Sequence, residues 1–143
     1  MGDILSEIRA SFGGGKTDLR TYSPLTFAYI GDAVFEIIIR TAIVEQGQRP
    51  ANVLHKHKAK IVCAKTQAKM LDAVYEELSE EEQDIYRRGR NAKIHSMAKN
   101  ASLSDYKKAT GFEALCGYLF LADNMERVIV IVKRALDLAE IEL

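Results

Sequence analysis

The sequence predicts an all-α fold built as a single helical domain, and three observations support this prediction. Apolar residues recur at helical spacing along most of the 143 residues, no segment shows the alternation of a paired strand, and only two prolines interrupt the chain. Nearly half of the residues are hydrophobic, which is enough for one substantial core. The sequence shows neither an apolar run of about 18 residues nor a signal peptide, so we expect a cytoplasmic protein with no membrane partner.

The elements can be assigned in chain order. Residues 1–22 are predicted to be a flexible tail, because Gly13-Gly14-Gly15 lies among polar residues with weak periodicity. Ser23 and Pro24 suit the N-cap and first turn of a helix that ends near Gly47.

The middle of the chain predicts two helices and a loop. The apolar stripe over 51–77 predicts one long helix. Ser79 and the three glutamates after it open a third helix that runs to about Arg88, since acids are favourable at the positive end of a helix. Residues 89–103 are polar and weakly periodic, which indicates a long loop.

The last part of the chain predicts two more helices, over 104–122 and 124–141, which contribute to the core. The two cysteines, Cys63 and Cys116, fall in apolar helical patterns without the spacing of metal ligands. They are therefore predicted to be reduced core residues.

Charge is strongly segregated along the chain, although the formal net charge is zero. Residues 49–71 hold six bases and no acid, residues 72–84 hold seven acids and no base, and residues 87–108 hold seven bases and one acid. The distribution of charge is a better guide to a binding surface than the net charge. The basic segments therefore indicate contacts with the phosphates of a nucleic acid.

The bases that we expect to contact RNA come from two of these segments, and the densest cluster, over 87–93, could alternatively be a solvated helix end. The aromatic residues are not interleaved with the bases, which favours a duplex held by its backbone over a stacked single strand. The predicted RNA-binding residues are Lys56, Lys60, Arg87, Arg88, Arg90, Asn91, Lys93 and Lys99.

Asp32 and Glu113 are the candidates for chemistry, because each acid lies in an apolar helical stretch that should be buried. A lone buried carboxylate is costly unless it is paired or binds a metal. The two acids are therefore predicted to meet and to hold a hard divalent cation such as Mg²⁺, which could activate water for phosphodiester hydrolysis. The alternative is that each pairs with a Lys or Arg. Glu36, one turn after Asp32, is either a further ligand or the polar edge of the helix.

Three segments carry a resemblance to a known family. Residues 28–35 (Ala-Tyr-Ile-Gly-Asp-Ala-Val-Phe) resemble the signature helix of the ribonuclease III catalytic domain, and residues 112–121 resemble the second acidic helix of that domain. Residues 87–93 (Arg-Arg-Gly-Arg-Asn-Ala-Lys) are similar to the short branch of the family, Mini-ribonuclease III, which lacks a double-stranded RNA-binding domain. The resemblance covers residues 23–143.

This resemblance implies that residues 23–143 form a ribonuclease III-type endonuclease domain in which Asp32 and Glu113 are the metal ligands and catalytic residues. It implies a homodimer that cleaves double-stranded RNA with Mg²⁺. For the short branch it further implies maturation of a 23S ribosomal RNA precursor, with a ribosomal protein as one suggested partner.

Two positions depart from the larger family. Ala28 and Thr110 stand where that family carries a further Glu and a further Asp, which leaves open the number of metal ions and their other ligands. This departure supports an alternative, a non-catalytic helical module for RNA binding or ribosome assembly. A helical protein-interaction domain would explain the apolar faces but not the segregated bases.

Overall fold

The computed structural model describes residues 3–93 and 102–143, and the described residues form seven α-helices and two short 3-10 helices without a β-strand. The all-α prediction is therefore confirmed. No helix in the described ranges has the length and apolar character needed to cross a membrane. The α-helices are α1 (Ile4–Phe12), α2 (Pro24–Val44), α3 (Ala51–Val62), α4 (Ala64–Val74), α5 (Glu80–Arg90), α6 (Leu103–Leu121) and α7 (Met125–Leu138), and the 3-10 helices are η1 (Leu19–Thr21) and η2 (Tyr75–Glu77).

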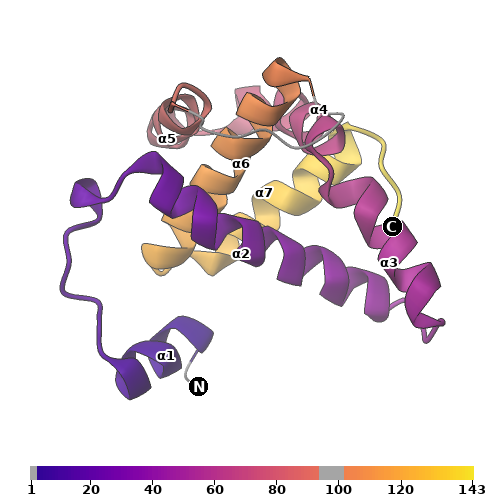
Figure 1. The fold of residues 1–143 in the computed structure, drawn as a ribbon, viewed down its shortest axis with the longest axis horizontal. Helices are drawn as coiled ribbons and strands as arrows, with labels where there is room; N and C mark the ends of the chain where they lie inside the picture. Colours follow the sequence, from indigo (N-terminus) through magenta and orange to yellow (C-terminus); the bar gives the residue numbers. More distant parts are fainter. Residues whose placement is uncertain (1–2, 94–101) are drawn as a thin grey trace.

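Helix α6 is the centre of the fold, since it packs against α2, α4, α5 and α7 (Figure 1). Its N-cap is Ser102, whose hydroxyl accepts a hydrogen bond from the backbone N–H of Asp105, and Ser23 caps α2 in the same way through Thr26. The core is aliphatic and aromatic, and its most deeply buried large side chains include Phe35, Ile39, Met70, Tyr86, Phe112, Leu115 and Val128.

Helices α2 and α6 cross so closely that their backbones touch. A Cβ atom added to Gly31 would overlap the carbonyl oxygen of Glu113, and one added to Gly117 would overlap the carbonyl oxygen of Phe27. Only glycine permits this approach at either position. The crossing places Asp32, the residue after Gly31, beside Glu113.

The helix predicted over 51–77 is interrupted, so that prediction was wrong at one point. Cys63 adopts an extended backbone conformation between α3 and α4, and it is exposed, whereas Cys116 is buried as predicted. Two side chains from α4 satisfy carbonyl groups at the end of α3: the Thr66 hydroxyl donates to Lys60 O (2.7 Å) and the Gln67 amide donates to Val62 O (2.8 Å). These bonds stabilise a break that helical periodicity alone does not reveal.

Residues 3–22, for which the sequence predicted a flexible tail, contain α1 and η1. Leu5 is the one buried residue of α1, and the Arg9 guanidinium donates to Leu121 O at the end of α6 (2.9 Å). A single buried position leaves little periodicity in the sequence, which explains why the helix was not predicted. The division into a tail and a catalytic domain stays a prediction.

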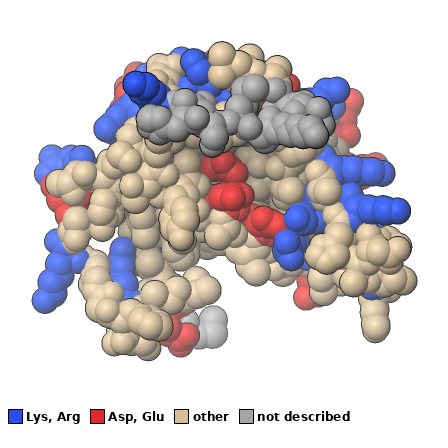
Figure 2. Space-filling model, viewed as in Figure 1, with Lys and Arg blue, Asp and Glu red and all other residues tan. Residues whose placement is uncertain are grey.

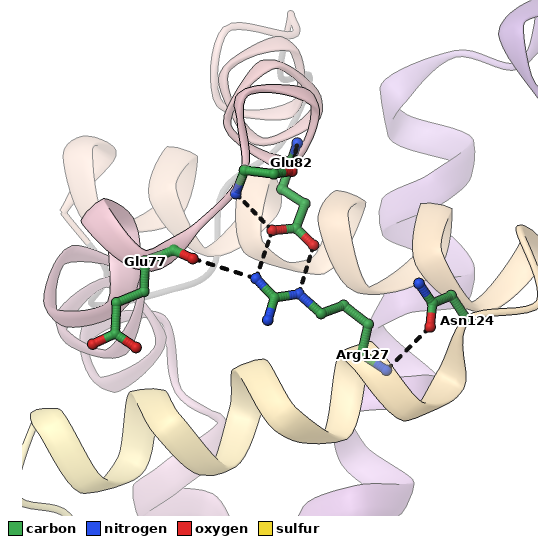
Figure 3. Close-up of polar contacts among 5 residues, drawn as sticks. Glu77, Glu82, Asn124 and Arg127 are labelled. Carbon is green, nitrogen blue, oxygen red and sulfur yellow. Dashed lines mark hydrogen bonds and ion pairs between the residues drawn. The ribbon is translucent and has the colours of Figure 1, made fainter.

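Helix α5 begins with a capping box between Ser79 and Glu82 and runs to Arg90, two residues beyond its predicted end. Glu82 is buried and accepts two hydrogen bonds from Arg127 of α7, at 2.7 and 2.8 Å (Figure 3). Arg127 also donates to Glu77 O (3.3 Å). This ion pair joins α5 and the segment before it to α7.

Candidate active site

The structure brings Asp32 and Glu113 together, as the sequence predicted. Both acids line an open pocket of about 630 Å³ between α2 and α6. Figure 2 shows acidic side chains gathered in a hollow near the middle of one face, with basic side chains on either side of it. The other lining residues include Leu25, Tyr29, Glu36 and Tyr106.

Asp32 is exposed, which corrects the prediction that both acids are buried, and Glu113 is half-buried. The difference arises because Asp32 lies on the face of α2 that borders the pocket rather than the core. Among the residues that the structure describes, neither carboxylate forms an ion pair with a Lys or Arg, so these residues give no support to the alternative of two separate ion pairs.

Burial, followed by the charge and hydrogen bond of the neighbouring Asp32 carboxylate, raises the pKa of Glu113 to about 8. A like charge nearby favours the neutral form of a carboxyl group. The pair therefore holds negative charge that no Lys or Arg of the described residues balances through an ion pair. Such a pair is suited to a divalent cation, which would displace the proton.

Glu36 borders the same pocket, but the protein neutralises it. Its Oε1 accepts hydrogen bonds from Arg40 Nε (2.9 Å) and lies 3.0 Å from Lys58 Nζ. These two cations hold the pKa of Glu36 below its ordinary value. This pairing favours the second of the two readings that the sequence allowed, in which Glu36 is the polar edge of the site.

Ala28 and Thr110, the positions that lack the further family carboxylates, do lie at this site. The Thr110 hydroxyl donates to Tyr106 O (3.0 Å), which is a local helical contact. The described residues contain no cluster of three His, Cys, Asp or Glu side chains suited to a metal. The two carboxylates nevertheless form an all-oxygen donor set, which fits a hard cation such as Mg²⁺ that keeps several waters.

Sequence reasoning missed Gln67. This residue of α4 is buried, and it lines a second pocket of about 240 Å³ together with Asp32, Glu113 and Thr110. The signal in the sequence was a polar residue within the apolar stripe of α4, beside Ala68 and Leu71. A buried polar side chain normally has a hydrogen-bonding role.

The predicted RNA-binding residues that the structure describes lie outside both pockets. On α3, Lys56 and Lys60 are exposed, and at the end of α5 only Arg90 is half-buried, with its guanidinium 5.5 Å from the centre of the Tyr86 ring. Lys99 lies outside the described residues. Exposed residues at the end of α5 and just after it are Arg87, Arg88, Asn91 and Lys93.

The fold and its acid pair define the class of protein. Residues 25–124 match the family model described as the ribonuclease III domain, and the chain belongs to that family of endoribonucleases. This finding confirms the resemblance stated above and removes the non-catalytic alternatives.

Within the family, the chain resembles proteins named Mini-ribonuclease 3. It is 50% identical to the one from Thermoanaerobacter sp. over 79% of this chain and 80% of the relative. It is 45% identical to the one from Symbiobacterium thermophilum over 84% of this chain and 92% of the relative. A crystal structure of a protein from Fusobacterium nucleatum has 30% sequence identity and a TM-score of 0.75, covering 82% of this chain and 96% of that one.

Proposed function

We propose that this endoribonuclease cleaves double-stranded RNA in a Mg²⁺-dependent reaction, and that it acts as a homodimer on a 23S ribosomal RNA precursor in the cytoplasm. The observation that carries the proposal is the acid pair, Asp32 and Glu113, which the α2–α6 crossing places at an open pocket without a cationic partner in the described residues. Residues 23–143 are the proposed catalytic domain, and a ribosomal protein bound to the precursor is a proposed partner.

Asp32 and Glu113 are the residues that would hold the cation. A divalent cation at such a site polarises a phosphate oxygen and lowers the pKa of a bound water. Asp32 faces the open pocket, where a phosphate can enter, while Glu113 comes from the more buried side. Arg40 and Lys58, by neutralising Glu36, limit the negative charge that an approaching phosphate would meet.

The basic residues of α3 and of the end of α5 would hold the duplex on either side of the acids. Contacts of this kind position the backbone and make binding depend on salt. Replacing Arg87, Arg88 and Arg90 with Ala should weaken duplex binding and flatten the dependence of log affinity on log salt. An unchanged salt slope would remove this cluster from the interface.

An exposed apolar stripe on α2 supports the homodimer. Leu25, Tyr29, Ala33 and Ile37 follow one another at helical spacing, and Tyr29 is 84% exposed. Because a duplex has two strands, a twofold dimer across this stripe would present one acid pair to each strand. Ile37→Asp should convert the protein to a monomer in analytical ultracentrifugation, and a dimer that survives would contradict this surface.

The main test uses Asp32→Asn. Purified wild type and variant are incubated with a long double-stranded RNA and with a 23S precursor, in Mg²⁺ and in EDTA. We expect cleavage by the wild type in Mg²⁺ alone, and none by the variant, although both bind RNA. Cleavage in EDTA would refute the metal dependence, and normal cleavage by the variant would refute the site.

A further inference from the structure

Gln67 holds a buried polar atom that the protein leaves without a partner. The side chain is 3% exposed, and its Oε1 makes no hydrogen bond, the one such buried side-chain oxygen or nitrogen among the described residues. An unsatisfied buried acceptor destabilises a fold, because the group loses its hydrogen bonds to water and gains none in return. Because Gln67 lines a pocket shared with Asp32 and Glu113, this unsatisfied atom calls for a functional explanation.

The orientation of the Gln67 amide is fixed by its other end. Nε2 donates to Val62 O at 2.8 Å, and exchanging the amide atoms would set two acceptors against each other. Oε1 is therefore the free atom. Gln67 also adjoins the acid pair, since it lines one pocket together with Asp32 and Glu113.

Gln67 Oε1 could add an oxygen ligand to the few that the acid pair offers. Two carboxylates are few ligands for a divalent cation, and the positions of two further family carboxylates are occupied here by Ala28 and Thr110. A glutamine carbonyl oxygen is a hard, neutral donor that can bind such a cation or one of its waters.

We propose that Gln67 supplies a third protein oxygen, Oε1, to a divalent cation held by Asp32 and Glu113, either directly or through a water of that cation. This inference rests on the proposed function, because it requires the acid pair to bind a cation. It makes the bond from Gln67 to Val62 O part of the site, since that bond fixes the direction of Oε1.

The alternative is that Gln67 has a structural role only, in which its amide donates to a carbonyl group at the end of α3. The chain offers a matched control for this alternative. Gln83 of α5 also donates through Nε2 to a backbone carbonyl, that of Tyr75, at 3.0 Å, and it does not line either pocket of the acid pair. Gln67→Met and Gln83→Met each remove such a donor and keep the length of the side chain.

The experiment titrates the metal-free protein with Mn²⁺ and follows the free ion by electron paramagnetic resonance. Circular dichroism and the metal-free melting temperature report on folding. We expect Gln67→Met to bind Mn²⁺ about 10-fold more weakly than the wild type. Gln83→Met should bind as the wild type does. Gln67→Glu, which keeps an oxygen at this position, should retain binding even if Gln67→Met fails to fold.

The outcomes separate this inference from the function it rests on. If Asp32→Asn loses Mn²⁺ but Gln67→Met binds it normally, the role of Gln67 is refuted and the acid site stands. Loss of binding in folded Gln67→Glu would refute that role as well. If Asp32→Asn binds Mn²⁺ as tightly as the wild type, the proposed metal site fails, and the role of Gln67 fails with it.

Discussion

Glu82 and Glu113 are two carboxylates that face the interior of the same small domain, and the protein treats them in opposite ways. Glu82 accepts hydrogen bonds from Arg127 and from the backbone N–H of Ser79 (Figure 3). These contacts hold the pKa of Glu82 below its ordinary value. Glu113 instead lies beside a second acid, and burial together with that acid raises its pKa to about 8.

Glu82 and Glu113 differ in the partners that the fold provides for each carboxylate. At Glu82 the charge is balanced within the protein by Arg127, and removing one partner of such a pair is destabilising. At Glu113 the described residues provide no Lys or Arg partner, so a proton or a bound cation would balance the charge. An acid pair that stays unbalanced next to a pocket is therefore evidence of function, whereas a balanced acid is evidence of structure.

The sharpest test of this comparison replaces each glutamate with glutamine, its neutral isostere. We expect Glu113→Gln to reduce RNA cleavage more than about 100-fold, because it removes a ligand rather than a supporting contact. Glu82→Gln should cleave at close to the normal rate at temperatures well below its melting point. The comparison fails if the two variants lose cleavage to the same extent while both remain folded.

A second test disturbs the helix crossing that brings the acids together. Gly31→Ala would drive a Cβ atom into the carbonyl oxygen of Glu113, which is backbone and cannot turn aside. We expect a loss of about 3 kcal/mol in the free energy of unfolding, with loss of cleavage in the remaining folded protein. Both would be measured by urea denaturation and by the RNA assay.

Gly89→Ala is the control for this crossing. A Cβ at Gly89 would lie 2.7 Å from the Ala114 side chain, so the clash is milder and lies between α5 and α6. It should cost less stability than Gly31→Ala. Equal losses of stability would show that the α2–α6 crossing is packed no more tightly than the α5–α6 contact.

The sequence allowed a good prediction of the elements and of the acid pair, because helix caps, periodicity and isolated acids are local signals. Ser23, Pro24 and the apolar runs around Asp32 and Glu113 are of this kind. The exposure of Asp32 and the break at Cys63 could not be predicted, since both depend on contacts between helices. Gln67 was missed for the same reason: in the sequence it is one polar residue in an apolar stripe.

A third prediction concerns the stability that the Glu82–Arg127 ion pair contributes. Glu82→Gln removes the charge that Arg127 needs and weakens the capping box of α5. Since the Arg127 side chain is 32% exposed, we expect a loss of about 2 kcal/mol, below the range for fully buried pairs. Thermal unfolding in EDTA would measure it, with Glu81→Gln, in the same helical turn, as the control. A loss of stability no larger than that of Glu81→Gln would show that the Glu82–Arg127 pair does not stabilise the fold.

The last expected effect is the pH dependence that Glu113 and Glu82 impose on the stability of the metal-free protein. Glu113 has a folded pKa of about 8, above its ordinary value of 4.5, so the unfolded chain releases this proton first. Stability should therefore fall as the pH rises from about 4.5 to about 8. Removing the titration with Glu113→Gln should make the variant more stable than the wild type near pH 8, with little difference near pH 5.

Glu82 has the opposite effect on the pH dependence of stability, because its folded pKa lies below its unfolded value. The stability that it contributes is present above the unfolded pKa and is lost as the pH falls through the folded pKa, so Glu82→Gln should differ from the wild type by a constant amount between pH 5 and pH 8. Melting temperatures of the three proteins in EDTA across this range would measure both trends. Because a bound cation would take the place of the Glu113 proton, added Mg²⁺ should abolish the downward trend in the wild type and leave the offset of Glu82→Gln unchanged. A wild type whose stability rises with pH in EDTA would show that Glu113 is balanced by the fold after all.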